Sequence, residues 1–153
     1  MGLGSMAFGY TVFSYFYVWT TAVAWLGCLG ICWLIARPQG VWRDVTRLAV
    51  LGGTFFVFLV PYAVLLSRRS HTMDEVQLVV RTHAPDLFRV PELISYFVIG
   101  AIAIGTATRM FELRDKATLF AVSLALAPIA VFNQQVITGQ SLQPIHYQVF
   151  IGN

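Results

Sequence analysis

The sequence contains very little charge. Only 11% of its 153 residues are Asp, Glu, Lys or Arg, against about 25% in a typical soluble protein. Hydrophobic residues make up 58% of the chain, and no charged residue precedes Arg37. This composition excludes an ordinary soluble domain and indicates an integral membrane protein.

Lysine and cysteine are also scarce. Lys116 is the single lysine, and the net charge of +3 is spread over several loops, whereas a nucleic-acid surface gathers Lys and Arg on one face. We therefore expect no nucleic-acid partner. Cys28 and Cys32 lie four residues apart in an apolar run that contains no histidine or carboxylate. That spacing puts them on one helix face, where free cysteines behave as small core side chains rather than as metal ligands.

Four apolar segments are long enough to cross a bilayer, which takes about 20 residues of helix. They cover residues 12–36, 48–66, 91–108 and 117–135. Lipid offers no hydrogen bonds to the backbone, so we predict that all four are helices. The N-terminus has no basic region, and its apolar run is longer than that of a signal peptide, so the first segment is predicted to be a retained span. The predicted fold is an all-α, polytopic membrane domain over residues 1–153.

Arginines near the span ends predict the orientation. The first short loop contains Arg37, Arg43 and Arg47, and the third contains Arg109, Arg114 and Lys116. Two crossings separate these basic loops, so both are expected in the cytoplasm of a multi-pass inner (plasma) membrane protein. The N-terminus, the loop at 67–90 and the C-terminal segment are then outside. The outer loop is also rich in arginine, but it is longer and carries four acids, Asp74, Glu75, Asp86 and, counted at its edge, Glu92.

The outer loop has two interpretations. Thr72 to Glu75 fits a capping box, and the valines after it favour a short interfacial helix. Pro85 with Asp86, and Pro91 with Glu92, fit the starts of further helices. In the functional interpretation Asp74 or Glu75 lies near the headgroups, where a carboxylate suits a general base or a metal ligand. The spacing of the three histidines, His71, His83 and His146, predicts no zinc site.

The segment from Asn133 to Tyr147 follows the last apolar run and contains five side-chain amides but no charge. Gly139 fits a position just beyond a helix end. The amides supply donors and acceptors without bringing a charge to the membrane edge. Two interpretations remain open, a structural loop and contacts to a polyhydroxylated substrate. The candidate substrate-binding residues here are Gln134, Gln135, Gln140, Gln143 and His146.

Two stretches, MDEVQLVVRTHAPDLFRVPEL and FNQQVITGQSLQPIHYQVF, resemble segments of large bacterial membrane proteins similar in architecture to the GT-C-type glycosyltransferases. This resemblance implies a polyprenyl-phosphate-linked sugar donor, transfer on the extracytoplasmic side and, in some members, a divalent metal. It makes Asp74 the candidate base with Glu75 beside it. Arginines that meet the lipid phosphate would be Arg68, Arg69 or Arg81.

The chain departs from that superfamily in two respects. Its acidic loop follows the second predicted span rather than the first, and members have about twice as many spans or more. We therefore expect residues 1–153 to be a fragment of a longer protein. Besides a glycosyltransferase-like enzyme, two functions remain open. One is a non-catalytic subunit that packs against partner transmembrane helices. The other is a transporter component, although the predicted spans contain no charge to line a path except Glu92 at the edge of the third.

Overall fold

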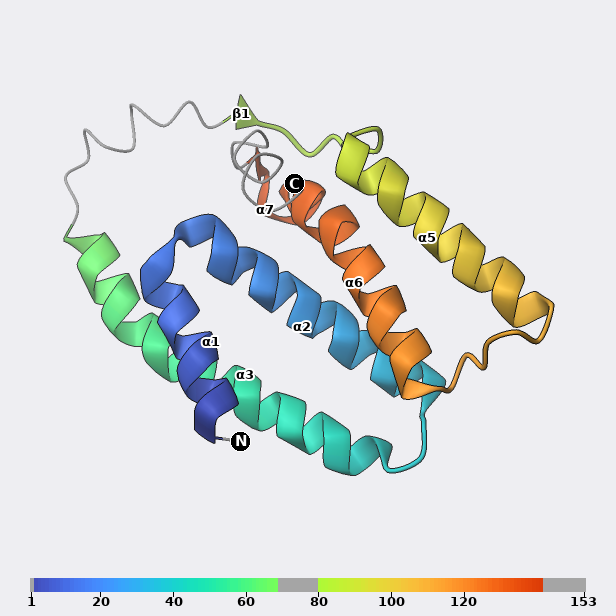
Figure 1. Cartoon of the computed structure of the whole chain (residues 1–153). Helices are drawn as coiled ribbons and strands as arrows, with labels where there is room; N and C mark the ends of the chain where they lie inside the picture. The colour runs from blue at the N-terminus through green and yellow to red at the C-terminus, as the bar shows by residue number, and fades with distance from the viewer. Residues whose placement is uncertain (1, 69–79, 142–153) are drawn as a thin grey trace.

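The structure is a computed structural model that describes residues 2–68 and 80–141 (Figure 1). It is all-helical apart from two short paired strands, and four of its helices are long and apolar enough to cross a membrane. The predicted fold class is therefore confirmed. The elements are α1 (Gly2–Ser14), α2 (Phe16–Ala36), α3 (Val41–Ser67), β1 (Val80–Arg81), α5 (Val90–Ala107), α6 (Lys116–Phe132), α7 (Gln135–Thr138) and β2 (Gln140–Ser141).

The first apolar run forms two helices rather than one. Tyr15 is extended (φ −153°, ψ 136°) and separates α1 from α2. Helix α1 turns back along α3, with the rings of Phe8 and Phe55 5.3 Å apart. At about 20 Å it is too short to cross a core of about 30 Å. The span expected at 12–36 therefore begins at Phe16. The start of α1 lies beside the middle of α3 (Figure 1). The sequence predicted one crossing that begins at an outer N-terminus, and it did not predict that α1 turns back along α3.

The long helices form a row in which α2 packs against both α3 and α6, and α5 packs against α6 (Figure 1). Successive long helices alternate in direction. One end of the bundle, here called the amide end, carries the segments 82–92 and 133–141. The opposite end, called the arginine end, carries the loops 37–40 and 108–115. This arrangement agrees with the predicted grouping of loops on two sides, while the assignment of each side to a compartment stays a prediction.

The best-packed contact lies between α2 and α6. Leu29, Cys32 and Trp33 of α2 form a buried cluster with Leu119 of α6. Nearby, the Trp25 indole N–H donates to Ser123 Oγ at 3.1 Å, which satisfies a polar group between the two helices. Cys32 is buried as expected, and Cys28 is partly buried; both are free thiols.

Much of the apolar surface is not covered by the chain itself. Phe55 is the single buried residue of α3, and large side chains such as Phe56, Val57, Phe97 and Ile104 are exposed on α3 and α5. Such extensive exposure of apolar side chains is unfavourable in water. These helices are therefore apolar enough to lie in a lipid bilayer.

Candidate functional site at the amide end

Two segments that are far apart in the sequence meet at the amide end. Strands β1 and β2 are antiparallel, with Arg81 opposite Gln140, and the Thr82 N–H donates to the Gly139 carbonyl at 3.1 Å. Gly139 caps α7 with φ +71°, and the His83 ring lies 3.0 Å from the position that a Cβ would take. A residue with a side chain would be strained and crowded there. The predicted role of Gly139 beyond a helix end is confirmed.

Glu92 is at the centre of this region, and its side chain is 0% exposed. Its Oε2 accepts from the Arg89 backbone N–H at 3.1 Å, which confirms the predicted role of Glu92 at the start of α5. Its Oε1 accepts from Asn133 Nδ2 at 2.6 Å. Asn133 Oδ1 in turn accepts from the Asp86 backbone N–H at 2.8 Å. Asn133, at the end of α6, therefore joins the start of α5 to the loop before it.

Asp86 and Arg89 complete the cluster on its more exposed side. The Arg89 Nε donates to Asp86 Oδ2, and both side chains are about one-third exposed. The guanidinium also lies over the Phe132 ring, with Cζ 5.7 Å from the ring centroid, a cation–π contact. Residues 82–88 are not helical, so the predicted helix start at Pro85 and Asp86 is wrong. Asp86 pairs with a side chain instead of capping a helix.

The described amides of this segment mostly bind the protein itself. The Gln135 side chain is buried, and its Nε2 donates to the Ala84 carbonyl at 3.3 Å. Gln134 Nε2 donates to the Gln140 carbonyl at 2.8 Å, and Gln134 Oε1 accepts from the Thr138 hydroxyl. His83 Nδ1 donates to the Val136 carbonyl at 3.1 Å. These contacts favour the structural-loop interpretation for Gln134 and Gln135, whereas the Gln140 side chain is exposed.

The other predicted site residues divide into two groups. Arg68, at the end of α3, and Arg81, in β1, are exposed at the amide end. The remaining predicted site residues lie outside the described residues: Arg69, Asp74, Glu75, Gln143 and His146. The interfacial helix predicted after Thr72 also lies outside them, except for Val80, which belongs to strand β1. Among the residues that the structure describes, no group of three or more His, Cys, Asp or Glu side chains could hold a metal ion.

The pairing of Glu92 with Asn133 is the feature that sequence reasoning missed. The sequence predicts Glu92 only as a helix-start residue and Asn133 only as one of several amides. The sequence does contain a signal for this pairing. Glu92 starts one span and Asn133 ends the next, and because consecutive spans are antiparallel, these two positions come to the same end of the bundle. Both oxygens of Glu92 are engaged by donors inside the protein. The Glu92–Asn133 pair therefore joins α5 to α6, and the partly exposed polar side chains next to it are Asp86 and Arg89.

Comparison of the chain with protein-family models, curated proteins and solved structures finds no significant match. The resemblance to the GT-C-type glycosyltransferases accordingly stays a prediction.

Proposed function

We propose that this chain is a non-catalytic membrane subunit that packs against other transmembrane helices. The observation that carries the proposal is an uncovered face of small residues on α3. Ala49 and Gly53, four residues apart, are both exposed, and a Cβ added at Gly53 would meet no atom within 4 Å. Small residues at this spacing let the backbones of two membrane helices approach closely.

Helix α5 supports the same conclusion. Ala103 and Ala107 are exposed on it, and Gly100 has no neighbouring atom within 4 Å of an added Cβ. Helices α3 and α5 lie at the two sides of the row (Figure 1). Each therefore has a side on which another helix fits without rearranging the bundle. Meanwhile the described polar groups at the amide end, above all Glu92 and Gln135, are used in internal hydrogen bonds.

The test is recovery of a partner chain from the membrane. Gly53→Leu adds bulk where a helix would approach, so co-purification of a partner in mild detergent is expected to fall about fivefold or more, the equivalent of about 1 kcal/mol. Val57→Leu is the matched control, because it places the same side chain one turn further along the same face, where a large exposed residue already stands. Equal recovery with Gly53→Leu and wild type, or no partner or second copy with the wild type, would refute the proposal.

A glycosyltransferase-like enzyme that uses a lipid-linked sugar is the second candidate. The pairing of Arg81 with Gln140 supports it, because that pairing joins the two segments that carry the predicted substrate-binding residues. Asp74→Asn and Glu75→Gln in the full-length protein are then expected to abolish sugar transfer without reducing the amount of protein in the membrane. Unchanged transfer in both variants would remove the catalytic assignment.

A further inference from the structure

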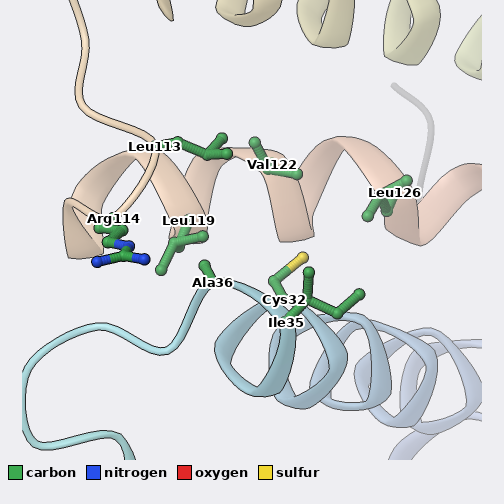
Figure 2. A pocket seen from close by; sticks show the side chains of 8 residues that line it. All are labelled: Cys32, Ile35, Ala36, Leu113, Arg114, Leu119, Val122 and Leu126. Carbon is green, nitrogen blue, oxygen red and sulfur yellow. The ribbon is translucent and has the colours of Figure 1, made fainter.

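A groove opens between α2 and α6 near the arginine end, on the side of their contact that other helices leave uncovered. It has a volume of about 460 Å³, which lies within the range of small-molecule sites. Figure 2 shows the side chains that line it, with Cys32 and Ile35 on α2 and Val122 and Leu126 on α6. All of these side chains are apolar. Arg114 lies at one end of the groove, beside Leu119.

The charges around the groove favour an anionic ligand. The arginine end carries six basic side chains and three acidic ones, Asp44, Glu112 and Asp115. Asp44 is engaged by Lys116 Nζ at 2.5 Å, and Asp115 caps α6 by accepting from the Ala117 and Thr118 N–H groups. Arg114 has no acidic side chain within 4.0 Å among residues 2–68 and 80–141. Its guanidinium is therefore available at the end of an apolar groove.

The length and the apolar lining of the groove suit the acyl chain of a lipid. From Leu119 to Leu126 it follows α6 for about 10 Å at 1.5 Å per residue. We propose that the groove binds one anionic phospholipid of the adjoining leaflet. An acyl chain lies between α2 and α6, and the phosphate meets Arg114.

Arg37 adds to this preference. It directly follows Ala36, which lines the groove, and its side chain is exposed. Basic side chains between transmembrane helices at the cytoplasmic surface bind acidic head groups, and each one near the surface contributes about fivefold in affinity. The site thus combines an apolar groove, wide enough for one acyl chain, with positively charged side chains at its end.

Native mass spectrometry of the intact chain in detergent tests the proposal. The probes are dioleoyl phosphatidylglycerol, which is anionic, and dioleoyl phosphatidylcholine, which is neutral overall. We expect the wild type to retain more of the anionic lipid. Arg114→Gln is expected to weaken phosphatidylglycerol binding about fivefold and to leave phosphatidylcholine binding unchanged. Arg109→Gln, which removes the same charge from the same loop outside the groove, is expected to change both by less than about twofold.

A second variant tests whether the acyl chain lies in the apolar groove. Ala36→Phe narrows the groove without altering its charge and is expected to lower retention of phosphatidylglycerol. Equal losses from Arg114→Gln and Arg109→Gln would indicate only diffuse attraction and would overturn the proposal. The proposal would also be overturned if Ala36→Phe bound phosphatidylglycerol as the wild type does, or if inorganic phosphate alone competed fully with the lipid. Cross-linking of a second copy of the chain through Ile35→Cys would show that another protein chain, and not a lipid, occupies the groove.

Discussion

Replacing Glu92 by glutamine tests whether the buried carboxylate holds the amide end together. Both groups that face its oxygens are donors, Asn133 Nδ2 at 2.6 Å and the Arg89 N–H at 3.1 Å. A glutamine offers one oxygen and one NH₂ group, so one of these donors must face another donor. Asn133 cannot turn its amide to compensate, because its Oδ1 accepts from the Asp86 N–H. Glu92→Gln therefore leaves one buried donor without an acceptor, which costs about 2 kcal/mol.

Thermal unfolding in detergent micelles measures this loss. For a chain of this length, about 2 kcal/mol corresponds to a fall in Tm of about 4–8 °C. Glu112→Gln is the matched control, since Glu112 is an exposed carboxylate in the loop before α6. Its replacement is expected to change the free energy of unfolding by no more than about 0.5 kcal/mol.

A double-mutant cycle separates the pair from the rest of the cluster. Glu92→Gln and Asn133→Ala remove the two partners of one hydrogen bond, so their effects are expected to be non-additive by about 0.5–3 kcal/mol. A Tm of Glu92→Gln within about 1 °C of wild type would refute the reasoning. Strict additivity of the two substitutions would refute the direct coupling, even if each variant is destabilised.

Two further predictions concern α1 and the orientation. Gly9→Ala is expected to cost about 1–2 kcal/mol of stability, because its methyl group would overlap the Phe58 ring. Gly4→Ala in the same helix meets no atom and is expected to stabilise slightly; a shift of the same sign in both would show that α1 does not pack on α3 at Gly9. With a membrane-impermeant maleimide, Gln140→Cys is expected to react in intact cells and Arg109→Cys only after permeabilisation. Labelling of both cysteines from the same side would exclude the four-span arrangement. Labelling of Arg109→Cys in intact cells and of Gln140→Cys only after permeabilisation would show that the predicted orientation is inverted.

The sequence located the membrane helices well because their signal is local. Uninterrupted apolar runs need helix to satisfy the backbone in lipid, and predicted spans such as 48–66 and 91–108 fall on α3 (Val41–Ser67) and α5 (Val90–Ala107). The break at Tyr15 gave no such signal, because the apolar residues continue through it. A hydropathy pattern also looks the same whether the chain continues straight or turns back. Only the contacts of α1 with α3 reveal the reversal.

The candidate site was harder to predict for a related reason. The sequence pattern identified two polar segments and the side of the bundle they share, but it left open whether their amides contact a substrate or only form a structural loop. The structure uses Gln134 and Gln135 to hold the segment 133–141 against the loop before α5 and against itself. The Gln135–Ala84 hydrogen bond joins residues 51 positions apart, and no local periodicity encodes such a pairing.

Composition and the spacing of apolar runs by themselves determined that this chain is an all-helical membrane domain with four long spans and basic loops at one end. These properties follow from the hydrophobic content of each segment and from the charges between segments. The tertiary structure alone decided that α1 folds back, that Glu92 and Asn133 are partners, and that a groove ending at Arg114 lies between α2 and α6. Each of these depends on which helix faces join, and that is set by packing across the bundle rather than by any segment on its own.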